Sequence, residues 1–235
     1  MLRLAPILLA LAYGLALYHF SAWRTARMLD RSSSPLADTA LLAMTGRLAR
    51  ALGHAEVPVR IYEVAPVNGL AAPDGRIFLT RGFYDRYREG RVTAEEMASV
   101  IAHELGHVAL NHSRRRMIDF SGQNAIRVAL ASVLGRFLPG GIGLWAASAL
   151  MALMAARLSR KDEFEADEWA SALLVKAGIG TGPQKSLFAK LGALTGSAGA
   201  PPQPAWLMSH PATAERIAAI EANERRWGLP VSSPG

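Results

Sequence analysis

The sequence His-Glu-Leu-Gly-His at residues 103–107 constrains the fold of this chain more than any other feature. Thr93 and Glu96 have the spacing of a capping box, and apolar residues recur at helical intervals after them, so the motif is expected on a capped helix. His103 and His107 then lie at i and i+4 on one face, where both imidazoles can reach one metal ion. The rest of the chain must bring a third ligand to the same point.

Glu104 lies beside the two histidines in this motif. A carboxylate there need not bind the metal, because it can accept a proton from a water molecule that the metal activates and pass it to a leaving amine. The alternative is a helix whose histidines are merely satisfied by neighbouring groups. The chain has no Cys, so a metal site must use His and carboxylates, and thiol nucleophiles are excluded.

His112 is one candidate for the third ligand. It follows His107 by five residues, but Leu110 stands where the metzincin pattern has a Gly. We therefore interpret His112 as a structural histidine or as one that supports a ligand.

The acidic run from Asp162 to Glu168 offers the second candidate. Glu163 and Asp167 share a helical face at i and i+4, so one can bind the ion while the other hydrogen-bonds the second nitrogen of a ligating His. Glu165 points about 160° away from that pair and is the weaker candidate. An exposed acidic helix is the alternative interpretation of this run.

The sequence predicts a mainly α fold with a small β-hairpin or sheet, of the α+β class. Val57–Val64 alternates like a strand, Asn68–Gly75 is rich in turn residues, and Arg76–Thr80 is rich in strand formers, so the two strands are expected to pair as a hairpin. Helices are expected at 36–52, from 93 onward, at 158–176, after Pro183 and at about 213–226.

The segment from Leu4 to Ala22 contains no charged residue and is just long enough to cross a hydrocarbon core of about 30 Å. Residues 1–24 are therefore predicted to be a single-pass membrane anchor, with a cleaved signal peptide as the alternative. Residues 32–228 are expected to form the catalytic domain and 229–235 a flexible tail. The orientation in the membrane is left open.

Residues 137–156 form a second uncharged segment. It lies between His107 and Glu163, which must meet at one ion, and a single membrane crossing would separate them. Two crossings would need about 40 residues. We therefore expect an apolar helix that is buried beside the active site or dips into the membrane.

The net charge of +7 is compatible with nucleic acid, with an anionic membrane surface or with a solvated basic face. The sequence shows no RNA-binding aromatic motif, zinc finger or helix-turn-helix pattern. Nucleic acid is therefore not an expected partner, whereas membrane lipid is.

Several motifs together resemble the membrane-associated zinc metallopeptidases of the HtpX, BepA and CAAX prenyl endopeptidase family. The resemblance rests on His103 to His107, the Glu163 to Asp167 pair, Asn68 with Ala71, Pro73 and Gly75, and Ser209-His210-Pro211 with Arg216. It covers residues 36–224. The hairpin departs from the family because an aromatic residue and a second Gly are more usual there, which leaves substrate preference open.

The resemblance implies a zincin-type core that holds one Zn²⁺ per chain. His103, His107 and Glu163 would be the zinc ligands, Glu104 the general base, and Asp167 the partner of a ligating histidine. These assignments come from the family's own site residues at the matching positions.

The late histidine of the family lies near the metal in some members. This implies that His210 takes part in catalysis, either by occupying the open zinc position or by stabilising the oxyanion.

The expected function is hydrolysis of internal peptide bonds in protein quality control, with protein or peptide substrates that include unfolded or membrane proteins. Substrate is expected to add as a strand to an edge formed by Arg76, Ile77, Phe78, Leu79 and Thr80. Two alternatives remain at this point: a zinc-binding, chaperone-like module with little hydrolytic activity, and a purely structural membrane-anchored helical protein.

Overall fold

A computed structural model of the chain describes residues 16, 19–20, 23–24, 26–72, 74–112, 142–191, 210 and 214–231, with side chains between 142 and 191 described from residue 159. Most of the predicted anchor at 1–24, the loop predicted at 195–204 and residues 232–235 of the predicted tail lie outside this description. Among the described residues, no helix has both the length and the apolar composition of a membrane span.

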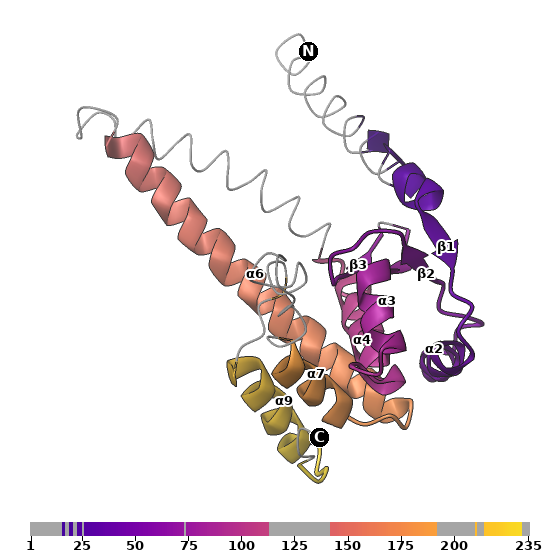
Figure 1. The fold of residues 1–235 in the computed structure, drawn as a ribbon. Coiled ribbons are helices and arrows are strands. Elements are labelled where there is room, and N and C mark those ends of the chain that lie inside the picture. The colour runs from indigo at the N-terminus through magenta and orange to yellow at the C-terminus, as the bar shows by residue number, and fades with distance from the viewer. Residues whose placement is uncertain are drawn as a thin grey trace, which may run out of the picture.

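The described elements form a mainly helical fold with one small mixed sheet, in agreement with the predicted class (Figure 1). In chain order they are β1 (Ser33–Pro35), α2 (Thr39–Leu52), β2 (Val59–Tyr62), β3 (Gly69–Ala71), β4 (Ile77–Thr80), α3 (Arg81–Arg88), α4 (Ala94–Ala109), α6 (Ile142–Lys176), α7 (Gly182–Lys190) and α9 (Ala214–Arg226).

The sheet has the strand order β1-β2-β4-β3. β1 pairs with β2 and β3 with β4 in antiparallel fashion, whereas β2 and β4 run parallel. The predicted hairpin between Val57–Val64 and Arg76–Thr80 is therefore wrong. The hairpin partner of β4 is β3, a three-residue strand inside the segment that the sequence suggested was only a turn.

β4 is an inner strand of this sheet, because it has β2 on one side and β3 on the other. Ile77, Phe78 and Leu79 are each 0% exposed. The expectation that substrate adds to an edge at Arg76–Thr80 is therefore wrong. Within the described residues, the strand at that end of the sheet is β3, which pairs only with β4.

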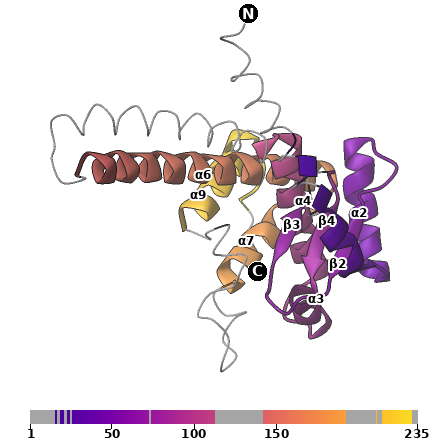
Figure 2. The ribbon, with the colours of Figure 1, turned by 90° about the horizontal axis from the view of Figure 1, so that it is seen from above.

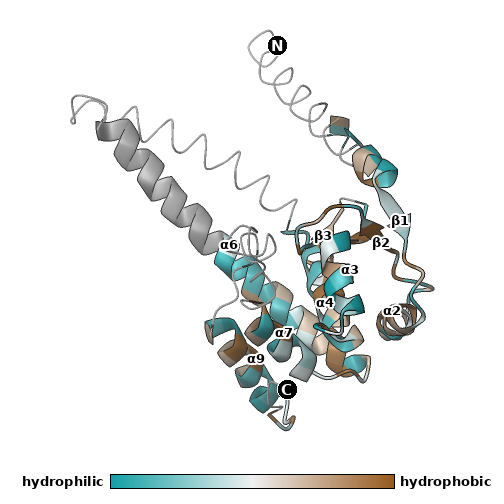
Figure 3. Cartoon of the chain, viewed as in Figure 1, coloured by the Kyte–Doolittle hydropathy of each residue, from teal (hydrophilic) through white to brown (hydrophobic). Residues whose placement is uncertain are grey.

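Helix α2 begins three residues later than the apolar pattern suggests. The side chain of Asp38 accepts hydrogen bonds from the backbone N–H groups of Ala40 and Leu41, both at 3.1 Å, and so caps the helix. Strand β1 ends at Pro35, and Leu36 to Asp38 connect it to the helix. Helix α3 is mostly hydrophilic, as the teal colour in Figure 3 shows, and buries only Phe83 completely.

Helix α4 lies in the core and begins at the predicted capping box of Thr93 and Glu96. Its apolar residues Met97 and Ile101 are 0% exposed and belong to one cluster with residues of α2, the sheet and α6. α4 therefore has neighbours on several sides, which fixes the direction of its buried side chains.

Helix α6 is one continuous helix of 35 residues, about 52 Å long. It joins the described part of the predicted apolar segment, 142–156, to the predicted helix 158–176. Figures 1 and 2 both show its first half extending away from the other labelled elements, whereas its second half lies against α4. A membrane-dipping role for this segment stays a prediction.

The last two described helices are joined by a buried ion pair. Lys185 of α7 donates a hydrogen bond of 2.9 Å to Glu224 of α9, and both side chains are 0% exposed. The hydroxyl of Thr181 donates to the same carboxylate. These contacts hold α9 beside α7 and α6, where its side chains reach the candidate site.

Candidate metal centre

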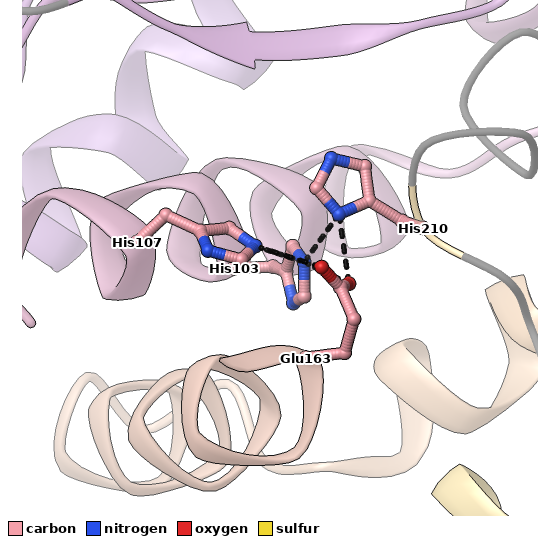
Figure 4. A group of neighbouring side chains, drawn as sticks. All are labelled: His103, His107, Glu163 and His210. Carbon is pink, nitrogen blue, oxygen red and sulfur yellow. Dashed lines mark hydrogen bonds and ion pairs between the residues drawn. The ribbon is translucent and has the colours of Figure 1, made fainter. Parts of the chain in front are cut away.

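Helix α4 carries His103, Glu104 and His107 into the interior, where they are 2%, 3% and 7% exposed. The two imidazole rings stand edge to face with centroids 4.7 Å apart. The predicted helical spacing thus places both histidines on one face, as Figure 4 shows.

Gly106 allows α6 to cross α4 at close range. A Cβ atom at this position would lie 3.0 Å from the carbonyl oxygen of Ala166 and 3.2 Å from its Cα atom. The missing side chain lets the two backbones approach, and Glu163, one turn before Ala166, then reaches the histidines.

The carboxylate of Glu163 faces both histidines (Figure 4). Its Oε2 atom lies 3.3 Å from Nε2 of His103, its Oε1 atom lies 3.5 Å from Nε2 of His107, and the two Nε2 atoms are 3.1 Å apart. A tetrahedral zinc ion with bonds of about 2.0–2.1 Å sets its ligand atoms about 3.3–3.4 Å apart. The spacing and the chemistry of these three donors therefore fit zinc.

His210 lies on a further side of this group, 8% exposed. Its Nδ1 atom is 2.7 Å from Oε2 of Glu163 and 3.3 Å from Nε2 of His103, and its Nε2 atom is 3.6 Å from Oε1 of Glu104. Possible ligand atoms of His103, His107, Glu163 and His210 all lie within 4.8 Å of one another. His210 therefore lies between the third donor and the candidate general base.

Asp167 and Arg216 lie behind His103. Oδ1 of Asp167 is 2.9 Å from Nδ1 of His103. Arg216 donates two hydrogen bonds to Asp167, from Nη2 to Oδ1 at 2.7 Å and from Nε to Oδ2 at 2.5 Å, and its guanidinium lies over the ring of Phe188. Both charged side chains are 2% exposed, so this bidentate pair is buried.

The surroundings of Glu163 and Asp167 favour the ionised form of both carboxyl groups. Burial alone would raise the pKa of Glu163, but hydrogen bonds with His103 and His210 outweigh it and hold that pKa well below its usual range. Burial also opposes the ionisation of Asp167, yet Arg216 and His103 lower its pKa. A carboxylate must be ionised to bind a metal, so Glu163 is in the required state.

The two histidines of α4 differ in proton affinity. Burial alone would lower the pKa of His103, but its hydrogen bonds with Asp167 and Glu163 raise the pKa to about 9. Burial and the neighbouring charge of His103 lower the pKa of His107 to about 2. The surroundings of His103 therefore favour a positive charge on its ring, whereas those of His107 favour the neutral imidazole, which can bind a metal ion.

His112 lies behind His107, 1% exposed. Its Nδ1 atom is 2.7 Å from Nδ1 of His107, and its Nε2 atom is 3.3 Å from Oε2 of Glu165 and 3.9 Å from Oδ1 of Asp162. It thus contacts a candidate ligand from behind and does not belong to the group of His103, His107, Glu163 and His210.

The edge strand β3 runs beside α4. A Cβ atom on Gly69 would lie 2.7 Å from Cγ1 of Val100 and 3.8 Å from Oε1 of Glu104, so only a glycine fits here without a shift. The sheet therefore reaches the site through β3 and not through the residues of β4 that the sequence suggested.

Arg216 and His210 are the residues of the site whose roles the residue patterns did not predict, and for Arg216 the sequence does contain a signal. Arg216, Ile220 and Glu224 recur at i, i+4 and i+8 on α9, and all three are buried. Charged residues on the same stripe as a core isoleucine indicate buried ionic partners.

Comparison with known proteins places these residues in a family. The model of Peptidase family M48 matches residues 35–224. The chain is 34% identical over 180 residues to Metalloprotease LoiP of Escherichia coli and 32% identical over 184 residues to Metalloprotease YcaL of the same organism, which in each case is 74% of this chain and 66% of the relative.

A putative beta-barrel assembly-enhancing protease of Vibrio cholerae is 26% identical over 188 residues, which is 77% of this chain and 38% of that protein. The chain thus spans slightly less than two thirds of the two Escherichia coli relatives. The family match covers most of the chain and includes all four residues around the candidate metal position, so the chain belongs to peptidase family M48.

Proposed function

We propose that this chain is a zinc-dependent endopeptidase that hydrolyses internal peptide bonds of proteins. The observation that carries the proposal is the spacing of the donor atoms of His103, His107 and Glu163, 3.1–3.5 Å, which fits one tetrahedral zinc ion. The metalloprotease names of two relatives support it.

Each residue has a defined task in this proposal. His103, His107 and Glu163 hold one zinc ion per chain. The bound ion would polarise the carbonyl of the scissile bond and make water more acidic. Glu104 is buried beside the ligands, so its carboxylate can take a proton from the attacking water and deliver it to the leaving amine.

His210 occupies the side of the site that substrate and water need. Its Nδ1 atom lies as far from Nε2 of His103, 3.3 Å, as two ligands of one tetrahedral ion would lie. We propose that His210 covers the fourth position in this arrangement, which predicts that His210→Ala raises peptidase activity. Lower turnover with unchanged zinc content and KM would instead assign it to the oxyanion.

Substrate is proposed to bind extended along β3 in place of the strand that the sequence suggested. β3 is the edge strand nearest to Glu104, and strand addition uses backbone hydrogen bonds with little demand on sequence. The Oδ1 atom of Asn68, just before β3, is buried without a hydrogen-bond partner in the described structure and could accept one from substrate. Such recognition suits unfolded proteins and hence quality control.

Membrane association is a further part of the proposal. Phe20 and Trp23 are 58% and 54% exposed; Phe20 lies near the end of the uncharged segment at 4–22, and Trp23 follows it directly, close to Arg24 and Arg27. Aromatic and basic residues favour the membrane interface. Removal of residues 1–31 is expected to release the protein from membranes with zinc still bound, and loss of zinc binding would assign the segment to the core.

The proposed function is tested by zinc content and casein digestion. We expect about one zinc per chain in the wild type. Glu104→Gln should keep the zinc and lose the digestion of casein, whereas Glu163→Gln should lose both. A wild type that binds zinc but digests casein no faster than Glu104→Gln would favour the chaperone-like alternative.

A further inference from the structure

The chain leaves α4 in a way that turns His112 back toward His107. Asn111 has φ 54°, a left-handed conformation that asparagine tolerates better than most other residues. If the helix continued, a residue five positions after His107 would point about 140° away from it. The turn at Asn111 instead places the two Nδ1 atoms 2.7 Å apart.

Two ring nitrogens at this distance share one proton, and the rest of the site decides which ring donates it. Nε2 of His107 faces Nε2 of His103 and Oε1 of Glu163, so it needs a free lone pair to bind an ion. Nδ1 of His107 therefore carries the hydrogen and donates it to Nδ1 of His112. His112 is then protonated at Nε2, the atom that lies 3.3 Å from Oε2 of Glu165.

The acidic end of this chain of contacts lies on α6. Asp162 is 3% exposed and has Oδ1 3.9 Å from Nε2 of His112, whereas the side chain of Glu165 is 32% exposed and also contacts Lys161 at 3.4 Å. The run that supplies Glu163 to the metal position thus supplies carboxylates to His112 as well. Glu165 accepts the hydrogen bond from Nε2 of His112, whereas Asp162 lies beyond hydrogen-bond distance of that atom and adds negative charge beside it.

We propose that His112, oriented by Glu165, is a positioning residue that fixes the tautomer and the ring direction of His107 for zinc binding. The inference rests on the proposed zinc site. It gives His107 the kind of support that Asp167 gives His103, since an outer partner orients a ligating imidazole and keeps its metal-facing nitrogen free.

Zinc affinity of the full chain, measured by competition with a chelator, tests this inference. His112→Ala should weaken zinc binding by about 10 to 100-fold, and Glu165→Gln should weaken it by about tenfold. His112→Asn should recover part of the loss, because the amide oxygen can accept from Nδ1 of His107. Lys161→Gln, which removes the exposed partner of Glu165 alone, is the matched control and should bind zinc like the wild type.

Two further measurements separate positioning from a structural role. The melting temperature in EDTA should be the same for Glu165→Gln and the wild type, since the change acts on the ligand geometry. The d–d absorption of bound Co²⁺ should change in His112→Ala and Glu165→Gln but not in Lys161→Gln.

The outcomes that contradict the inference are distinct from failure of the proposed function. A wild type without zinc would remove the proposed function itself. A zinc-binding wild type whose affinity is unchanged in His112→Ala and Glu165→Gln would overturn the positioning role alone. Two zinc equivalents that fall to one in Glu165→Gln, with the tighter affinity unchanged, would make His112, Asp162 and Glu165 a separate metal site and also overturn it.

Discussion

His103 and His107 lie one turn apart on the same face of α4, yet the structure surrounds them differently. Behind His103 stands a buried ion pair of Asp167 and Arg216, and the pKa of His103 rises to about 9. Behind His107 stands the imidazole of His112, and burial together with the neighbouring charge of His103 lowers the pKa of His107 to about 2. Two histidines at equivalent helical positions therefore differ in proton affinity because their surroundings differ: carboxylates contact His103, whereas His107 is buried beside the charge of His103.

Removal of Arg216 should have the largest effect on the surroundings of His103, because it breaks the buried ion pair with Asp167. Arg216→Met keeps most of the side-chain volume but leaves Asp167 buried without its cation, which typically destabilises a protein by about 3–5 kcal/mol. Urea unfolding of the variant in EDTA measures this change in the free energy of unfolding.

Arg226 on the same helix provides the control. It pairs with Glu168 at the surface, with side chains 58% and 49% exposed, so Arg226→Gln should change stability by about 0–1 kcal/mol. If the two variants were equally stable, the ion pair behind His103 would not stabilise the fold.

The pH dependence should show opposite signs with and without zinc. The pKa of His103 is about 9 in the folded protein against an ordinary value of 6.5, so its contribution to stability is complete below pH 6.5 and is lost as the pH rises through about 9. Zinc must displace that proton, so zinc affinity should rise by about tenfold per pH unit over the same window.

Melting in EDTA and chelator competition between pH 6.5 and 9 measure the two trends. The exposed His54 lies outside the site, and His54→Gln should leave both trends unchanged. A melting temperature and a zinc affinity that are both independent of pH would show that His103 carries no extra proton.

The sequence predicted the parts of the site that depend on helical spacing. Thr93 with Glu96, His103 with His107, and Glu163 with Asp167 are each three or four residues apart, and one helical turn determines how such pairs meet. Helix boundaries set by apolar periodicity, such as that of α9, were also close.

Contacts between distant segments could not be predicted in this way. Turn residues near Asp74 indicate a hairpin but do not determine which strand pairs with β4, so the sequence predicts neither strand β3 nor the inner position of β4. The partner of Asp167 lies 49 residues further on, in Arg216. The role of His210 is predicted only from the resemblance to the family, because a single histidine has no partner at a helical spacing that would indicate a site.

Asp167→Asn should weaken zinc binding without abolishing it. The amide oxygen can still accept a hydrogen bond from Nδ1 of His103, but the negative charge that raises the pKa of that ring is lost. We expect an affinity about 10 to 100-fold below that of the wild type, measured by chelator competition.

Glu168 is the neighbouring surface carboxylate, 49% exposed, and Glu168→Gln should bind zinc like the wild type. Equal losses in both variants would point to the net charge of α6 as the cause, and the specific support of His103 would then be disproved.

Gly106 lies where α6 crosses α4, and Gly106→Ala should disturb the surroundings of both His103 and His107. The new methyl group would meet backbone atoms of Ala166 at 3.0–3.2 Å, which can yield only if α6 moves away from α4. Overpacking of this kind costs about 1–3 kcal/mol of stability, and the shift of Glu163 should also weaken zinc binding.

Gly46 in α2 is the matched control, because its added methyl group would meet only the end of the Arg50 side chain, at 3.5 Å. Gly46→Ala should therefore stabilise the protein by up to about 1 kcal/mol through helix propensity and leave zinc affinity unchanged. Thermal melting and chelator competition on the two variants would show whether the close helix crossing is needed, and a Gly106→Ala protein with wild-type zinc affinity would show that it is not.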